Sequence, residues 1–220
     1  MNGTAISHEY VHGSFELHVV STGNGDQASF VKAAEEVWPR VDYIHIREKQ
    51  LTWQEKIGWA ESLCGAGVPS CRIVISGSEL SPQNDIYGGV HWGQEAIRNY
   101  NNDVISNVHR VRLGVSVHSI DEAKIAEEQG ADYLFFGHVY STNSKPDLEP
   151  RGLYALDEVC RGVSIPVMAI GGIKPGNIHA IRSAGAQGVA VISNIWASDS
   201  PDQAAASLRQ AIVATGSPCR

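Results

Sequence analysis

Short apolar runs alternate along this chain with longer segments in which apolar residues recur at helical spacing. The short runs are rich in Val, Ile and aromatic residues, which is typical of strands buried on both faces of a parallel sheet. The pattern therefore predicts parallel strands separated by helices. The expected strands are Phe15–Val20, Tyr43–Ile46, Arg72–Ile75, Gly89–His91, Arg112–Val117, Tyr133–Phe136, Val167–Ile170 and Gly188–Ile192.

Helix signals lie between most of these runs. Ser119–Gln129 begins with the spacing of a capping box, and Gly130 follows its last residue. Pro175–Ala184 has a proline in its first turn and Gly185 after its end. A helix within Glu79–Tyr87 is only weakly indicated, because a proline and a polar run favour a loop or a single turn there. Further helices are expected at Gln27–Val37, Thr52–Ala66 and Ser200–Ala214.

These strand–helix units follow one another without a linker or a change of composition, which favours one closed (β/α)8 barrel, the α/β fold known as the TIM barrel. A dinucleotide-binding sheet would need three spaced glycines after the first strand, and Ser21–Asp26 has only two, so we interpret it as a turn. The 220 residues suffice for a single sizeable core. We expect an N-terminal extension at 1–14 and the barrel at 15–220.

Composition narrows the range of partners. The net charge of -7 disfavours nucleic-acid binding. No apolar run is long enough to span a membrane, and the polar start lacks the order of a signal peptide, so we expect a cytoplasmic location and no membrane partner. The four cysteines form no Cys-x-x-Cys pair and are interpreted as free thiols. Association into a homo-oligomer stays open, because Trp53, Trp59 and Trp196 suit an interface as well as the core.

Two strand ends suggest a phosphate site. Active sites of such barrels lie at the carboxyl ends of the strands. Gly171 and Gly172 follow the seventh expected strand, and Ile192 and Ser193 follow the eighth. Glycines let backbone N–H groups approach an anion, and a helix N-terminus adds further donors. The pair of strand ends therefore favours phosphate binding over the alternative of a simple tight turn.

Residues with basic side chains end the second strand. His45, Arg47 and Lys49 alternate and therefore share one face, which points into the barrel mouth. Such groups are costly there unless an anion meets them, so we expect an anionic ligand, with an internal salt bridge as the alternative.

Ser116 and His118 share a face at the end of the fifth strand. The helix N-terminus that follows suits His118 as a neutral general base, while a structural histidine bonded to a backbone carbonyl is equally compatible.

The end of the sixth strand adds further candidates. His138 follows this strand, and a polar loop over 141–151 carries Thr142, Lys145 and Arg151. Lys145 and Arg151 are candidates for a lid over an anion, whereas a solvated loop is the alternative and is preferred for Arg151 taken alone. His91 after the fourth strand is interpreted as a packed barrel histidine, with a ligand contact as the alternative. No paired acids stand at the mouth, so no metal site is expected.

The strand-end motifs are specific when taken together and in order. They are His45-Ile46-Arg47-Glu48-Lys49, Gly89-Val90-His91-Trp92-Gly93-Gln94, Gly114-Val115-Ser116-Val117-His118-Ser119, Phe136-Gly137-His138-Val139-Tyr140-Ser141-Thr142 with Lys145, Ala169-Ile170-Gly171-Gly172-Ile173 and Val191-Ile192-Ser193. On these motifs the chain resembles the thiamin phosphate synthase superfamily from about Phe15 to Ala214. The resemblance implies one of two activities on this barrel. A synthase joins a pyrimidine pyrophosphate to a thiazole phosphate with magnesium, and a thiazole tautomerase (TenI) aromatises a carboxythiazole phosphate.

Individual motif positions distinguish the synthase from the tautomerase within this resemblance. The synthase pattern has metal-binding aspartates where this chain has Gly77 and Ala96. The histidines at 118 and 138 stand in tautomerase-like motifs, whereas Arg47 and Lys49 match residues that hold pyrophosphate in the synthase. The resemblance therefore implies the tautomerase as the first expectation, with the synthase as the alternative. A catalytically idle protein that binds thiazole phosphate is a third possibility.

The tautomerase expectation assigns a role to each candidate residue. His118 would move the proton as the catalytic acid–base, and no cofactor would be needed. The phosphate-binding residues would be Gly171, Gly172, Ile192 and Ser193, and the other substrate-binding residues would be His45, Arg47, Lys49, Ser116, His138, Thr142 and Lys145.

Overall fold

The computed structural model describes residues 15–77, 86–93, 95–96, 111–142 and 147–216. The expected extension at 1–14 and Lys145 lie outside these residues, as does most of the weakly indicated helix within Glu79–Tyr87. Within the described part of the chain, no helix is both long and apolar enough to cross a membrane.

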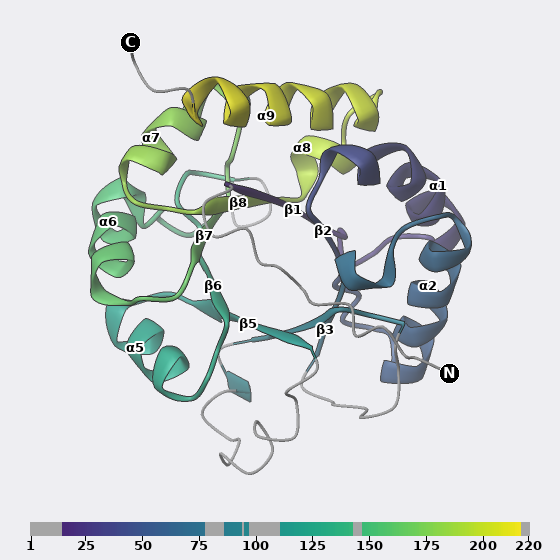
Figure 1. The fold of residues 1–220 in the computed structure, drawn as a ribbon, viewed down its shortest axis with the longest axis horizontal. Coiled ribbons are helices and arrows are strands. Elements are labelled where there is room, and N and C mark those ends of the chain that lie inside the picture. Colours follow the sequence, from purple (N-terminus) through teal and green to yellow (C-terminus); the bar gives the residue numbers. More distant parts are fainter. Residues whose placement is uncertain (1–14, 78–85, 94, 97–110, 143–146, 217–220) are drawn as a thin grey trace, which may run out of the picture.

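The described residues form a closed barrel of eight parallel strands in sequence order, with β8 pairing back to β1. The described helices lie on the outside of the barrel (Figure 1). This confirms the single TIM barrel predicted from the apolar runs. The strands are β1 Glu16–Val20, β2 Tyr43–Ile46, β3 Ile73–Ser76, β4 Gly89–Trp92, β5 Arg112–Val117, β6 Tyr133–Gly137, β7 Val167–Ile170 and β8 Gly188–Val191.

Most helices lie where the sequence signals place them. The Ser119 hydroxyl caps α5, and Thr52 begins α2 with a complete capping box. The expected helix at Pro175–Ala184 instead starts with a 3-10 turn. Helix α6 was not among the expected helices, because its first residue is a glycine and no side chain caps it. The α-helices are α1 Gln27–Val37, α2 Trp53–Gly65, α5 Ile120–Glu128, α6 Gly152–Gly162, α7 Ile178–Ser183, α8 Ser193–Trp196 and α9 Pro201–Gly216, and the 3-10 helices are η1 Trp38–Arg40, η2 Ser70–Arg72 and η4 Pro175–Asn177.

The strands divide the core into an outer layer under the helices and an interior. On β2, Ile44 and Ile46 are fully buried in the outer layer, whereas His45 points into the barrel against Phe135. The interior apolar cluster is small and consists of Val20, Tyr133, Phe135, Met168 and Ala190. Polar side chains fill much of the remaining interior, unlike the branched apolar layers that are usual in this fold.

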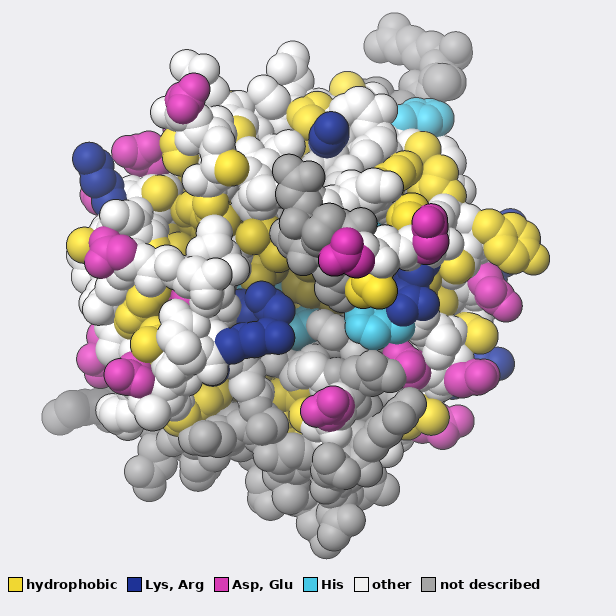
Figure 2. Space-filling model, turned by 180° about the vertical axis from the view of Figure 1, so that it is seen from behind, with side chains coloured by type: hydrophobic (Ala, Val, Ile, Leu, Met, Phe, Trp, Pro, Cys, Tyr) yellow, Lys and Arg dark blue, Asp and Glu magenta, His cyan; other side chains and the backbone are white. Residues whose placement is uncertain are grey.

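The two ends of the barrel differ in character. In Figure 1 the strands follow one another clockwise around the barrel in sequence order. Because strand–helix–strand crossovers are right-handed, this order means that the amino ends of the strands face the reader. Figure 2 therefore shows the carboxyl ends, where Lys, Arg and His side chains surround a central hollow. The side chains that end the strands meet at this face, which positions the candidate site.

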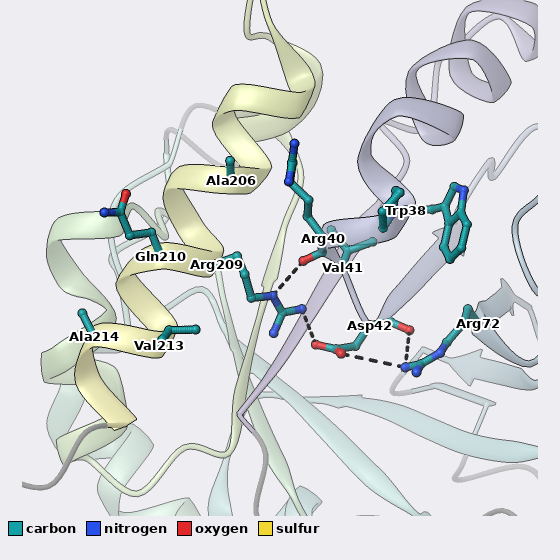
Figure 3. A pocket seen from close by; sticks show the side chains of 11 residues that line it. Trp38, Arg40, Val41, Asp42, Arg72, Ala206, Arg209, Gln210, Val213 and Ala214 are labelled. Carbon is teal, nitrogen blue, oxygen red and sulfur yellow. Dashed lines mark hydrogen bonds and ion pairs between the residues drawn. The ribbon is translucent and has the colours of Figure 1, made fainter.

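An open pocket of about 710 Å³ lies at the opposite, amino end (Figure 3). Its guanidinium groups already have protein partners. Arg209 donates to an Asp42 carboxylate oxygen at 2.7 Å and Arg40 to Asp202 at 2.6 Å, while Arg72 donates to the Asp42 carbonyl at 3.1 Å. These contacts fasten α9 to the start of β2, and they lie away from the carboxyl-end site.

Candidate active site at the carboxyl ends of the strands

The loop after β7 depends on two glycines. Gly171 and Gly172 have φ angles of +96° and +67°, a region that L side chains rarely adopt. A Cβ at Gly171 would lie 2.3 Å from the Cβ of His138, and one at Gly172 would lie 2.6 Å from the Ser141 carbonyl oxygen. Glycine is therefore required at both positions, because the loop packs directly against the segment after β6.

Hydrogen bonds fix the shape of this glycine loop. The Tyr140 amide donates to the Gly171 carbonyl at 3.1 Å, and the Asn177 side chain donates to the Gly172 carbonyl at 3.0 Å. Both carbonyls are thus engaged by the protein. Among the described residues no acceptor is bonded to the amides of Gly172 and Ile173, so these N–H groups remain available to an anion.

The residues after β8 lie on the neighbouring strand. β7 and β8 pair in parallel, with Ile170 opposite Ala190, so Ile192 and Ser193 end beside the glycine loop. The Ile192 carbonyl accepts the amides of Ile195 and Trp196, and Ser193 is the first residue of the short helix α8. The structure therefore brings the four expected phosphate-binding residues to one edge of the mouth.

The charged side chains at the end of β2 differ in their surroundings. Arg47 is half-buried and Lys49 is exposed, and among the described residues neither pairs with a carboxylate. Glu48 between them is fully buried and accepts the amides of Gly23 and Gly25 at 3.1 and 3.3 Å. The internal salt bridge, which was the alternative to an anionic ligand, is thus not found in the described part of the chain. Sequence reasoning assigned no role to Glu48, which holds the loop after β1.

His118 stands half-buried at the end of β5. Its Nδ1 lies 3.0 Å from the Gly137 carbonyl oxygen. Because a carbonyl only accepts, Nδ1 carries a proton, so Nε2 is the basic nitrogen whenever the ring is in its neutral form. Arg151 Nε donates to the same carbonyl at 3.1 Å. His118 thus makes the backbone-carbonyl contact expected of a structural histidine. It nevertheless lies at the barrel mouth with the other candidate residues.

His91 and Ser116 are bonded to each other. His91 Nε2 lies 2.9 Å from Ser116 Oγ, and His91 Nδ1 lies 3.2 Å from the Tyr133 hydroxyl. Burial, with smaller effects of His18 and Arg47, lowers the pKa of His91 to about 3, so its ring is neutral near pH 7. This is the packed barrel histidine that the sequence indicated, and it supports the half-exposed Ser116 from below.

His138 lies next to the glycine loop but uses one ring nitrogen inside the protein. His138 Nε2 lies 3.0 Å from the Leu148 carbonyl oxygen, to which it donates. The Arg151 amide donates to the His138 carbonyl at 2.9 Å. These two bonds tie the far end of the loop over 141–151 to β6. Thr142 is half-buried at the start of this loop.

A divalent metal does not fit where the family pattern would place one. Lys56 Nζ donates to the Ser76 carbonyl at 2.8 Å, and a Cβ at Gly77 would lie only 3.6 Å from that ammonium. A buried ammonium repels a divalent cation, and neither Gly77 nor Ala96 supplies a carboxylate. Among the described residues no group of three His, Cys, Asp or Glu side chains could hold a metal ion.

Comparison with known proteins decides the family. The family model described as thiamine monophosphate synthase matches residues 17–195. The chain belongs to this family. A thiamine-phosphate synthase of Bacillus velezensis is 34% identical over 217 residues, and the match covers 92% of this chain and 92% of that one. A thiamine-phosphate synthase of Geobacillus kaustophilus is 42% identical over 164 residues, and the match covers 69% of this chain and 68% of that one.

Solved structures agree with this family placement. Thiamine phosphate pyrophosphorylase from Pyrococcus furiosus superimposes with a TM-score of 0.72 at 26% identity, covering 92% of this chain and 98% of that one. KGPDC from Streptococcus mutans has a TM-score of 0.74 at 16% identity, covering 92% of this chain and 99% of that one, and shows the shared fold alone. The superfamily resemblance inferred from the strand ends is thus confirmed.

These relatives overturn the first functional expectation. The tautomerase was favoured because two acids are missing, at Gly77 and Ala96, and because His118 and His138 stand in tautomerase-like motifs. The curated relatives are instead named thiamine-phosphate synthase, at 34 to 46% identity. The tautomerase expectation is therefore wrong. It gave a few strand-end positions more weight than the similarity that extends over the whole barrel.

Proposed function

We propose that this chain is a transferase that joins hydroxymethylpyrimidine pyrophosphate to thiazole phosphate, forming thiamine phosphate and releasing pyrophosphate. The observation that carries the proposal is that two separate sets of hydrogen-bond donors without a protein acceptor or counter-ion, among the described residues, lie at one end of the barrel. The glycine loop offers backbone amides, and Arg47 and Lys49 are cations with no carboxylate partner among the described residues. Two phosphorylated substrates require two such features.

The proposal gives each feature one substrate. The phosphate of the thiazole binds at Gly171, Gly172, Ile192 and Ser193, beside the Gly172 and Ile173 amides, which have no acceptor among the described residues. The pyrophosphate binds Arg47 and Lys49, and Lys145, which lies outside the described residues, is a further candidate for it. His45, Ser116, His138 and Thr142 contact the organic parts of the two substrates. The relatives named thiamine-phosphate synthase support the joining reaction as a whole.

The reaction follows from this placement. The ring nitrogen of the thiazole uses its lone pair to form a bond to the pyrimidine methylene carbon. The bond from that carbon to the pyrophosphate oxygen breaks, and the electron pair leaves with pyrophosphate. Arg47 and Lys49 stabilise the charge that grows on the departing oxygens, and the barrel mouth aligns the two rings. No proton needs to be removed from carbon, so His118 contacts the substrates in this proposal and is not required as a base.

The direct test is to incubate the purified chain with both substrates and measure thiamine phosphate and pyrophosphate. We expect equal amounts of the two products, and neither when one substrate is omitted. The reaction is run with added magnesium and with a chelator, because the described residues provide no carboxylates for the metal. Binding of both substrates without any product under either condition would overturn the proposal.

A further inference from the structure

A chain of hydrogen-bonded polar side chains runs through the barrel interior from its amino end. Arg112 donates to Glu16 Oε2 at 2.9 Å, His18 Nε2 lies 2.8 Å from the same oxygen, and His18 Nδ1 lies 2.9 Å from His45 Nε2. Both histidines are fully buried, and the Glu16 and Arg112 side chains are 16% and 5% exposed. We call Arg112, Glu16, His18 and His45 the interior relay.

The ionisation states in the relay are set by these contacts. Burial alone would raise the pKa of Glu16, but its bond to His18 and the charge of Arg112 bring the pKa below its ordinary value. Burial lowers the pKa of His18, and Glu16 only partly opposes this. Burial, together with the neighbouring His18, His91 and Arg112, holds the pKa of His45 well below its ordinary value. At neutral pH the carboxylate is therefore charged and both imidazoles are neutral.

The Glu16 carboxylate determines which ring nitrogen of each relay histidine carries the proton. A carboxylate only accepts, so His18 Nε2 carries the proton and His18 Nδ1 has the lone pair. His18 Nδ1 must then accept from His45, so His45 Nε2 carries a proton as well. The remaining nitrogen, His45 Nδ1, is left as an acceptor. It is fully buried and has no hydrogen-bond partner among the described residues.

This unused acceptor lies below the candidate active site. His45 is the inward residue of β2 that precedes Arg47 on the same face. Its ring centroid is 5.6 Å from that of His91, whose two nitrogens are engaged by Tyr133 and Ser116. Both nitrogens of this neighbouring ring are thus committed, and a buried acceptor without a donor is costly. A ligand that reaches below Arg47 would supply the missing donor.

We propose that His45 Nδ1 accepts a hydrogen bond from a neutral N–H or O–H group of the bound substrate, and that Glu16 and His18 are positioning residues that fix this polarity from the amino end of the barrel. The substrate part of the proposal rests on the proposed function. The polarity part does not, because it follows from the hydrogen bonds of the chain alone.

The first experiment is a long-range ¹H–¹⁵N NMR correlation on the full chain labelled at histidine nitrogen, without ligand. We expect His18 and His45 each to show a protonated Nε2 and an unprotonated Nδ1 at neutral pH. A protonated His45 Nδ1 would overturn the polarity part whatever the enzyme does.

The second experiment adds the two substrates separately, with inorganic pyrophosphate as a ligand that lacks N–H groups. We expect one organic substrate to shift the His45 Nδ1 resonance, and pyrophosphate to leave it in place. If product forms but neither substrate shifts Nδ1, the substrate part is overturned while the proposed function stands. If Nδ1 shifts but no product forms, only the proposed function fails.

Variants separate positioning from simple packing. His18→Phe keeps a ring against Tyr43 but removes the acceptor for His45, so we expect a mixed His45 tautomer and about three- to tenfold weaker substrate binding. Glu16→Gln keeps one oxygen that can accept from both Arg112 and His18, so it should retain the wild-type pattern. Tyr133→Phe removes a nearby polar atom outside the relay and should also leave His45 unchanged. A folded His18→Phe protein with the wild-type His45 pattern and affinity would overturn the positioning role.

Discussion

His18 Nδ1 and His45 Nε2 lie 2.9 Å apart across two adjacent strands, with both side chains fully buried. The contact joins the amino-end ion pair of Glu16 and Arg112 to a ring beneath Arg47 at the opposite end. The interior of this barrel therefore contains a directed series of hydrogen bonds in place of purely apolar layers. Its buried groups govern how stability responds to acid and to substitution.

The three interior histidines should make the fold sensitive to mild acid. Burial lowers the pKa of His18, His45 and His91 in the folded chain, whereas the unfolded chain titrates near the ordinary value. Below about pH 6.5 the unfolded state therefore binds more protons, and stability falls with falling pH by up to about 1.4 kcal/mol per pH unit for each histidine. Urea unfolding at several pH values between 7 and 5 measures this slope. A free energy of unfolding that does not change over this range would contradict the buried neutral assignment.

Breaking the interior ion pair should be costly. In Arg112→Met the Glu16 carboxylate loses a partner at 2.9 Å while it remains largely buried, so we expect a loss of about 3–5 kcal/mol in the free energy of unfolding. The matched control is Arg161→Ala, because the Arg161 side chain is 79% exposed and its pair with Asp157 should contribute about 0–1 kcal/mol. Chemical denaturation of both variants checks the difference, and similar losses would contradict it.

The glycine loop should tolerate no side chain. In Gly171→Ala the new Cβ would lie 2.3 Å from the Cβ of His138 in a backbone with φ of +96°, so the loop must move. The left-handed conformation alone costs about 1–2 kcal/mol, and we expect phosphate-ester binding to be lost. Gly176→Ala is the control, because nothing lies within 4 Å of its Cβ position. Calorimetric titration with thiazole phosphate compares the two, and wild-type affinity in Gly171→Ala would remove the loop from the site.

Arg47 should act mainly on the pyrophosphate-bearing substrate. Arg47→Ala removes charge-assisted hydrogen bonds worth about 1.5–3 kcal/mol, so we expect kcat/KM for that substrate to fall by roughly ten- to 150-fold. Affinity for thiazole phosphate should change little. Lys32→Ala, which removes an exposed cation on α1, is the control for overall charge. An equal loss for both substrates would mean that Arg47 does not distinguish the two anion sites.

Local patterns were enough to predict the barrel and which candidate residues stand at the carboxyl ends of its strands. Strand positions follow from short apolar runs, and helix α1 matches its predicted bounds because period and caps are local properties. The same reasoning placed Gly171 and Ser193 at carboxyl ends, where parallel strands meet. Helix α6 was missed because it begins without a cap, and the function was misjudged because a few motif positions outweighed similarity along the whole chain.

The sequence by itself determined which residues face inward and which strand ends share a face, because a two-residue period fixes this within each strand. Only the tertiary structure decided which inward groups meet. Glu16 and Arg112 are 96 residues apart and come together through barrel closure. His138 was expected to contact the substrate, but one of its ring nitrogens is hydrogen-bonded to the Leu148 carbonyl, which the loop brings next to it. Hydrogen-bond partners depend on the register between strands and on the path of loops, and neither can be read from the local pattern of residues.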